Sequence, residues 1–248
     1  MNIVLDTHTH TLASGHAYNT MTEMIDAAVQ KGLKLLAITE HAPAMPGSCK
    51  DFYFYNLKIL PRFQKGLEVM FGVELNVMDY EGHVDLSEKY MECTDLRIAS
   101  LHPPCIKPGT IEENTAAMLG IIHNPDILGH PDDGRYPLDY ERVIVEAEKC
   151  GKIVELNNNS MSPLNSRTNA RENDLIILDL CKKYKVPVVM ATDAHASFMV
   201  GDMTQAIEVV EETGFPEELL LNDSVEKFKH FLNEGRKKSE TLREAQRS

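Results

Sequence analysis

Histidine and acidic residues recur at the ends of successive short apolar runs along this chain. Most of the runs are followed within a few residues by a side chain that can bind a metal ion. The nine candidates are His8, His10, His16, His41, Glu74, His102, His130, Asp193 and His195. Imidazole nitrogen and carboxylate oxygen are typical ligands of catalytic zinc, manganese and iron sites. The residues therefore predict a centre that holds several metal ions.

Four of the candidates form two pairs with i, i+2 spacing. His8 and His10 directly follow Ile-Val-Leu-Asp-Thr, while Asp193 and His195 end the apolar run Val-Val-Met-Ala-Thr. Alternate residues of an extended chain point to the same side, so each pair can share one ion. Glu74 ends Val-Met-Phe-Gly-Val, where a carboxylate is expensive to bury unless it is paired or metal-bound. We expect all five residues to bind metal, and Glu74 and Asp193 to serve in catalysis as well.

Three single histidines follow apolar runs of their own: His41, His102 and His130. One such histidine is more often a hydrogen-bonded core or surface residue than a ligand. Their recurrence at successive run ends favours the metal site. The pattern supports His16 least, because this residue lies in Ala-Ser-Gly-His-Ala beyond the first run. The histidines without a preceding apolar run are interpreted as structural or surface residues: His83, His123 and His230.

The elements that would position these residues alternate between strand and helix. Short β-branched or Leu-rich runs predict seven strands, at residues 2–6, 33–39, 67–73, 96–100, 127–129, 152–156 and 186–191. Helical spacing of apolar residues predicts helices at 22–31, 57–65, 110–121, 139–149, 171–183 and 204–213. A last helix at 224–233 would be followed by a charged stretch that frays. This alternation indicates parallel strands with helical crossovers.

Parallel strands of this kind can close into a barrel or form an open sheet. A barrel brings the C-terminal ends of all its strands to one face, where ligands from distant parts of the chain converge. An open doubly wound sheet would gather them at a reversal of strand order. Candidate ligands at six of the seven strand ends favour the barrel. We expect a distorted TIM-like (β/α)7 barrel in a single α/β domain over residues 1–235, followed by a charged C-terminal tail at 236–248.

Composition limits the class of partner. The net charge of -13 over 248 residues argues against an extended nucleic-acid surface, which needs clustered Lys and Arg. Bound cations can still make a pocket of an acidic protein positive, which suits a small anionic substrate.

Five widely spaced cysteines without a CxxC pair indicate reduced thiols rather than disulfides. The chain shows no signal-peptide pattern and no apolar stretch of about 18 residues, so we expect a cytoplasmic protein without a membrane partner. Its oligomeric state is left open.

The series of candidate ligands resembles the polymerase and histidinol phosphatase (PHP) superfamily, and within it the YcdX-type phosphatases. The resemblance covers residues 1–235 and includes the motifs His8-Thr9-His10, Gly129-His130-Pro131 and Asp193-Ala194-His195. It implies a distorted seven-stranded barrel with three divalent metal ions, usually zinc, with manganese or iron in relatives. It also implies how the ligands divide among the ions: His8, His10, Glu74 and Asp193 at one, Glu74, His102 and His130 at a second, and His16, His41 and His195 at a third.

The activity expected of such a centre is hydrolysis of small phosphate monoesters. Neighbouring cations lower the pKa of a shared water, and the resulting hydroxide attacks phosphorus in line. Protonation of the leaving group is open between a bound water and Asp193. Guanidinium groups would orient the phosphate, with Arg167 favoured over Arg135 and Arg171. Asp6 and Glu40 lie beside ligands, where they would orient imidazoles or cap strand ends.

Other functions share this metal centre. A histidinol-phosphate phosphatase would differ in the loops that bind the amino alcohol. A phosphodiesterase or nuclease would need a groove with basic and aromatic side chains, and the absence of Trp with 6% aromatic residues weighs against it. A non-catalytic metal-binding module would bind phosphorylated ligands without releasing phosphate, and an amidohydrolase would cleave amides instead.

Overall fold

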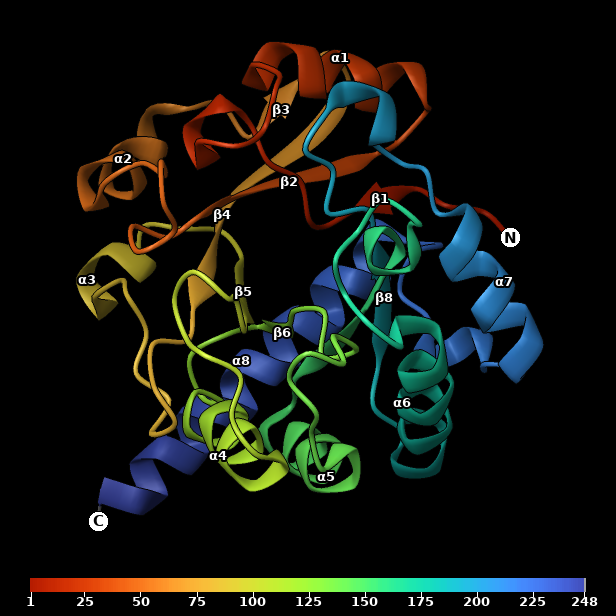
Figure 1. Ribbon diagram of the computed structural model, residues 1–248. Helices are drawn as coiled ribbons and strands as arrows, with labels where there is room; N and C mark the ends of the chain where they lie inside the picture. Colours follow the sequence, from red (N-terminus) through yellow and green to blue (C-terminus); the bar gives the residue numbers. More distant parts are fainter. Residues whose placement is uncertain (248) are drawn as a thin grey trace.

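The computed structural model describes residues 1–247 and shows a nearly closed barrel of seven parallel strands (Figure 1). In their spatial order the strands are β1 (Leu5–Asp6), β2 (Leu35–His41), β4 (Leu67–Asn76), β5 (Arg97–Ser100), β6 (Ile127–Leu128), β7 (Ile153–Asn157) and β8 (Val188–Ala191). The ends of the barrel meet at a parallel bridge between Thr9 and Ala194, beside which the His10 N–H donates to the Ala194 carbonyl at 2.9 Å. The predicted seven-stranded α/β barrel is confirmed.

Helices connect the strands and surround the barrel (Figure 1). They are α1 (Met21–Gln30), α2 (Asp51–Asn56), α3 (Glu88–Met91), α4 (Ile111–Gly120), α5 (Tyr140–Cys150), α6 (Ala170–Tyr184), α7 (Thr204–Thr213) and α8 (Val225–Arg247). Short 3-10 turns are η1 (Leu12–Ser14), η2 (Leu57–Ile59), η3 (Asn158–Met161), η4 (Ser197–Met199) and η5 (Glu217–Leu219). Capping boxes begin α1 and α4, with Thr20 and Thr110 as the capping residues. Each helix within residues 1–247 is too short or too polar to cross a membrane.

The helix predicted at residues 57–65 is wrong. Only the turn η2 forms there, and the chain then enters the short strand β3 (Phe63–Gln64), which pairs antiparallel with β4. Pro61 has no N–H to continue a helix, so the helical spacing of the apolar residues is interrupted. Lys65 and Gly66 both have positive φ and form the tight turn between β3 and β4.

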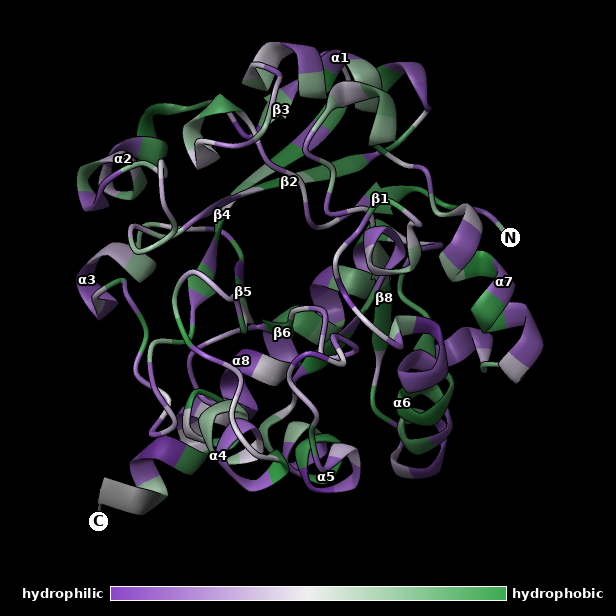
Figure 2. Cartoon of the chain, viewed as in Figure 1, coloured by the Kyte–Doolittle hydropathy of each residue, from purple (hydrophilic) through white to green (hydrophobic). Residues whose placement is uncertain are grey.

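Two apolar clusters line the two sides of the barrel wall. Along β2, Leu35 and Ala37 belong to the inner cluster, whereas Leu36 and Ile38 pack with residues of the surrounding helices. A parallel strand is buried on both faces, and in Figure 2 β2 is hydrophobic along most of its length. The inner cluster uses residues from the beginning of each strand. The polar residues near the strand ends are thus left at the opposite end of the barrel interior.

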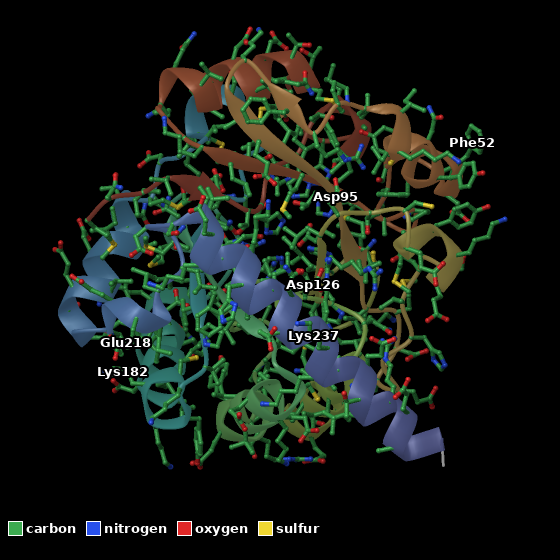
Figure 3. All side chains as sticks on the ribbon, turned by 180° about the vertical axis from the view of Figure 1, so that it is seen from behind. Phe52, Asp95, Asp126, Lys182, Glu218 and Lys237 are labelled. Carbon is green, nitrogen blue, oxygen red and sulfur yellow. The ribbon has the colours of Figure 1, made fainter. Side chains whose placement is uncertain are left out.

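Helix α8 covers the N-terminal ends of the strands. Its side chains Phe228 and Leu232 are buried in the same cluster as the barrel interior, and Figure 3 shows the helix crossing the back of the barrel past Asp126. The prediction that the helix ends at residue 233 and frays beyond it is wrong. Arg236 binds Asp126 through two nitrogens at 2.6 and 2.8 Å, and Ser239 donates to the Cys150 carbonyl at 2.8 Å. These anchors are polar, so apolar periodicity gave no sign of them. The division of the chain at residue 235 stays a prediction.

Candidate metal centre

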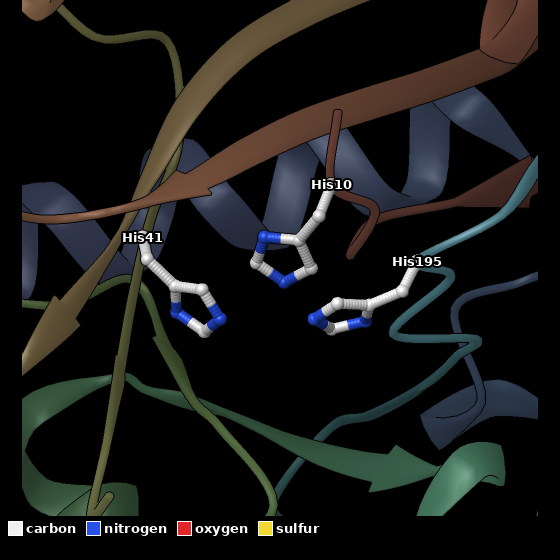
Figure 4. Close-up of side chains that lie close together, drawn as sticks. All are labelled: His10, His41 and His195. Atoms are coloured by element: carbon white, nitrogen blue, oxygen red, sulfur yellow. The ribbon is translucent and has the colours of Figure 1, made fainter. Parts of the chain in front are cut away.

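All nine candidate ligands lie at the C-terminal end of the barrel. The ring centroids of His10 and His41 are 4.3 Å apart, and those of His10 and His195 are 4.5 Å apart. Figure 4 shows these three imidazoles turned toward one another from β2 and from the segments after β1 and β8. The His16 ring lies 4.9 Å from that of His41 and 4.8 Å from that of His195. The residue least supported by pattern thus joins the same cluster.

Glu74 lies among five imidazoles. Its Oε2 is 2.7 Å from Nδ1 of His41, 3.3 Å from Nε2 of His8 and 3.5 Å from Nε2 of His10. Its Oε1 is 3.0 Å from Nε2 of His130 and 3.2 Å from Nε2 of His102. A carboxylate whose two oxygens face different groups of imidazoles has the arrangement that bridging of two cations requires.

Asp193 lies on the other side of the cluster. Its Oδ1 is 3.3 Å from Nε2 of His10 and 3.8 Å from Nε2 of His8. Ligand atoms within 4.8 Å of one another form three groups here: His8, His10 and Asp193; His41, Glu74 and His102; and His10, His41 and His195. The groups overlap, so His10 and His41 can each reach more than one position. The division of ligands that the resemblance implies stays a prediction.

The donor set of this cluster fits bound cations. Five atoms of the candidate ligands are buried and make no hydrogen bond within the described residues: Nε2 of His8, Nε2 of His10, Nδ1 of His41, Nδ1 of His130 and Oε2 of Glu74. A buried polar atom without a partner costs about 1–3 kcal/mol, and native proteins contain few of them. Several such atoms facing one another are what a metal site leaves when its ligands are considered without the ions.

The electrostatics keep key groups in the forms that bind metal. Burial lowers the pKa of His10 well below its usual value, and the neighbouring His41 and His195 lower it further. Burial and the same two neighbours lower the pKa of His16 to about 4. Burial raises the pKa of Glu74, but the adjacent histidines outweigh it and hold that pKa well below its usual range. At neutral pH these two imidazoles are neutral and this carboxylate is ionised, as metal coordination requires.

A layer of polar residues holds the imidazoles from behind. His8 Nδ1 lies 2.7 Å from Glu155 Oε1, and the other oxygen of Glu155 accepts the His130 N–H at 2.8 Å. His102 Nδ1 lies 2.8 Å from Asn76 Oδ1. The contacts of His8 and His102 each fix one ring nitrogen so that the other faces the centre, whereas the contact of His130 fixes its backbone N–H. Glu155 and Asn76 were missed by sequence reasoning. For Glu155 a signal existed, because it is a carboxylate inside the apolar strand β7, as Glu74 is inside β4.

Glu40 and Asp6 were expected either to orient imidazoles or to cap strand ends, and each takes one of these two roles. Glu40 accepts a hydrogen bond from Ser14 Oγ at 2.6 Å, and Ser14 Oγ lies 3.0 Å from Nδ1 of His10. Glu40 therefore orients an imidazole through Ser14. Asp6 accepts from Thr192 Oγ1 at 2.6 Å and from the Thr192 N–H at 3.1 Å, and in the described part of the chain it contacts no imidazole ring. It links the ends of β1 and β8, which is the strand-capping alternative.

Two of the candidate ligands have unusual backbone conformations. His130 has φ of 28° and Asp193 has φ of 51°. Residues other than glycine rarely adopt positive φ, and each such residue costs about 1–3 kcal/mol. Strain of this kind collects at functional sites, where the surrounding structure holds it. Here it accompanies the turn of both side chains toward the cluster.

A cleft of about 620 Å³ opens from the metal-binding cluster at His16, Asp193 and His195. Arg167 lies in its wall and donates to Asp193 Oδ2 and to Ser160 Oγ, both at 2.9 Å. Arg135 also lines the cleft. Arg171 lies outside it, where its guanidinium binds Glu212. The structure therefore brings two of the three candidate arginines to the cleft, and one of them, Arg167, contacts a candidate ligand.

Two buried carboxyl groups lie behind this wall. Asp132 and Asp174 are buried, and their carboxyl oxygens have no hydrogen-bond partner within residues 1–247. Burial raises the pKa of Asp132 to about 7. Burial and the charge of Asp132 raise the pKa of Asp174 well above its usual value. The charge of Asp132 thus disfavours ionisation of Asp174, a feature that sequence reasoning did not find.

Comparison with known proteins identifies the family. The family model described as PHP domain matches residues 6–159. A probable phosphatase of Thermoanaerobacter sp. (strain X514) is 45% identical over 241 residues, covering 96% of this chain and 98% of that protein. A probable phosphatase of Caldicellulosiruptor saccharolyticus is 47% identical over 234 residues, covering 94% and 97%.

A solved structure shares the fold. It is the histidinol phosphate phosphatase of Lactococcus lactis subsp. lactis Il1403, complexed with zinc, L-histidinol and phosphate. Its TM-score is 0.60 at 16% identity, with 87% of this chain and 95% of that chain covered. The family match spans more than half of the chain and agrees with relatives that cover nearly all of it, and the chain therefore belongs to the PHP domain family.

Proposed function

We propose that this chain is a metal-dependent phosphatase that hydrolyses small phosphate monoesters at a centre of three divalent cations. Phosphoric ester hydrolysis is the class to which the family and the probable phosphatases among its relatives point. The observation that carries the proposal is the position of Glu74, whose two oxygens face five imidazoles amid buried atoms without hydrogen bonds. Zinc is the first choice of metal, because the related Lactococcus enzyme was solved with it. Manganese and iron are alternatives that the same ligands accept.

Each ion would take its ligands from different strand ends. The proposed sets are His8, His10, Glu74 and Asp193 for one ion, Glu74, His102 and His130 for a second, and His16, His41 and His195 for a third. Divalent cations held there would neutralise phosphoryl oxygens and activate water for attack on phosphorus. Glu155, Asn76 and Ser14 keep the imidazoles in place, so the site need not reorganise during the reaction.

Arg167 and Arg135 would orient the substrate. The side chain of Arg167 is almost fully buried and is held by Asp193 and Ser160 at the point where the cleft meets the metal ligands. A guanidinium fixed in this way can bind phosphoryl oxygen with little loss of rotamer freedom. Arg135 is held by Asp133 and Ser166 further along the cleft. Asp193 thus connects a metal position to the phosphate-binding arginine.

The test combines metal analysis with phosphate release. Protein purified without chelator is examined by inductively coupled plasma mass spectrometry, then assayed on phosphate monoesters, a phosphodiester and short oligonucleotides. We expect about three metal ions per chain, phosphate release from monoesters, and loss of activity after demetallation that added metal restores. The His102→Ala variant loses metal and activity, while the matched variant His230→Ala, at an exposed position of α8, retains both. Phosphate binding without release, or full activity after exhaustive demetallation, contradicts the proposal.

A further inference from the structure

The cleft that opens from the metal centre extends well beyond the space that a phosphoryl group needs. Its volume of about 620 Å³ lies within the roughly 300–1,000 Å³ of small-molecule sites. Its far walls come from η3 and the following loop on one side and from η4 and the start of α7 on the other. If the proposed function holds, the leaving group of the ester occupies this part of the cleft.

The two arginines of the cleft are bound within the protein, and Asp202 is bound through one of its oxygens. Arg167 is held by Asp193, and Arg135 donates to both oxygens of Asp133. Asp202 accepts the Thr204 N–H at 3.2 Å and the Thr204 hydroxyl at 2.6 Å at the beginning of α7, both through Oδ1. The far part of the cleft therefore offers one carboxylate oxygen, Oδ2 of Asp202, and no free guanidinium for a second phosphate.

Two polar side chains that remain free in the cleft are uncharged amides. The side-chain amides of Asn159 and Gln205 make no hydrogen bond with any other residue between 1 and 247, and both line the cleft. Each amide offers donors and an acceptor. Hydroxyl groups both donate and accept, so they match such amides without the desolvation of a charge.

Two apolar side chains line the same cleft and are exposed. Phe198 on η4 is 80% exposed, and Leu164 on the loop after η3 is 96% exposed. Exposed apolar groups beside polar ones are typical of ligand sites. The face of an aromatic ring carries partial negative charge and attracts the weakly positive C–H groups of a saturated ring.

We propose that the substrate is a phosphorylated monosaccharide, whose sugar lies against Phe198 and whose hydroxyls bind Asn159 and Gln205. The inference rests on the proposed phosphatase function and names its substrate class. A sugar presents C–H groups on one face and hydroxyls at its edge, which matches the combination of one exposed aromatic ring with uncharged amides. A cationic amino alcohol such as histidinol would instead depend on the Asp202 carboxylate, one oxygen of which already accepts two hydrogen bonds from Thr204.

Kinetics on four substrates test the inference: glucose 6-phosphate, ribose 5-phosphate, histidinol phosphate and methyl phosphate. Methyl phosphate is too small to reach the far wall. We expect at least one sugar phosphate to have the highest kcat/KM. The Gln205→Ala, Asn159→Ala and Phe198→Ala variants each lower the ratio of kcat/KM for that sugar phosphate over methyl phosphate about tenfold, since each loses one contact. The matched Gln30→Ala variant, at an exposed position of α1, leaves the ratio unchanged.

Two results overturn the inference. One is a preference for histidinol phosphate that Asp202→Asn abolishes. The other is a ratio that none of the three cleft variants changes. Absence of turnover on every ester, methyl phosphate included, defeats the proposed function instead. In that case, calorimetry of the metal-loaded protein with the phosphonate analogue of glucose 6-phosphate decides: binding weakened by Gln205→Ala supports the sugar site, and no binding refutes it.

Discussion

The Glu155→Gln variant isolates the effect of one buried carboxylate charge on the metal centre. Glu155 is fully buried, with Oε1 2.7 Å from Nδ1 of His8. Its Oε2 accepts from the His130 N–H at 2.8 Å and from Asn157 Nδ2 at 3.0 Å. Glutamine has the same shape, but its amide accepts on one side only. Either His8 or the donor pair of His130 and Asn157 then faces an N–H group.

The magnitude follows from the contact that is lost. Burial raises the pKa of Glu155, but the charges of His8 and His130 and the hydrogen bonds from His8 and Asn157 together outweigh burial and lower that pKa, so the side chain is ionised at neutral pH. A hydrogen bond to a charged group contributes about 1.5–3 kcal/mol, which is roughly 10- to 150-fold in an equilibrium constant. Changes in the residues that hold metal ligands commonly lower affinity about 10- to 100-fold. We expect Glu155→Gln to bind zinc about 10- to 100-fold more weakly.

Zinc competition with a chromophoric chelator at pH 7.5 measures this affinity directly. Phosphate release is followed in parallel at limiting and at saturating zinc, and part of the activity is expected to return at saturation. Glu240→Gln, at an exposed position of α8, removes the same charge far from the centre and serves as the control. Wild-type zinc affinity and turnover in Glu155→Gln refute the role given to this carboxylate.

Three further changes probe the centre and the barrel. Glu74→Gln removes the charge among five imidazoles, so we expect mass spectrometry to show the loss of at least one ion and turnover to fall by orders of magnitude. An unchanged far-UV circular dichroism spectrum would show that the barrel is intact. Asp174→Asn removes a buried carboxyl group whose pKa is raised, because the folded protein favours the protonated form. As pH rises above about 4, ionisation of Asp174 increasingly destabilises the wild type. We therefore expect the variant to gain more in melting temperature at pH 8 than at pH 5, and equal gains at the two pH values contradict the argument. Gly235→Ala places a Cβ 2.1 Å from the Gly151 carbonyl oxygen. Such overpacking destabilises the folded protein by about 1–3 kcal/mol, so we expect the melting temperature to fall by several degrees. The control variant Glu240→Ala leaves the melting temperature unchanged.

The barrel and the cluster could be predicted because both depend on local patterns. Apolar runs that end in His8, Glu74 or Asp193 mark strand ends, and a parallel barrel places all such ends together without any knowledge of side-chain contacts. The helix at residues 57–65 was predicted wrongly because apolar spacing was considered without Pro61, which ends the helical turn. The end of α8 was predicted wrongly for a different reason. Arg236 and Ser239 hold the helix through a carboxylate and a carbonyl group, and apolar periodicity does not detect such partners.

The residues that hold the ligands in place were harder to predict. His8 and Glu155 lie 147 positions apart, and their contact depends on which ring nitrogen faces away from the centre. Arg167 was expected to bind substrate, and its ion pair with Asp193 depends on how the loop after η3 folds back over β8. Spacing within a sequence carries no information about such pairs. They follow from the three-dimensional packing of loops that no repeat or motif marks.

The contact between the first and last strands determines when, during synthesis, the ligands after β1 and β8 can come together. His8 and His10 follow β1, Asp193 and His195 follow β8, and the bridge between Thr9 and Ala194 fastens the two ends. A chain still emerging from the ribosome holds the first histidines long before it holds their acidic partner. An ion held by His8, His10 and Asp193, as we propose, would be fully enclosed only after residue 193 has been synthesised, so metal binding at this position would complete the barrel rather than start it.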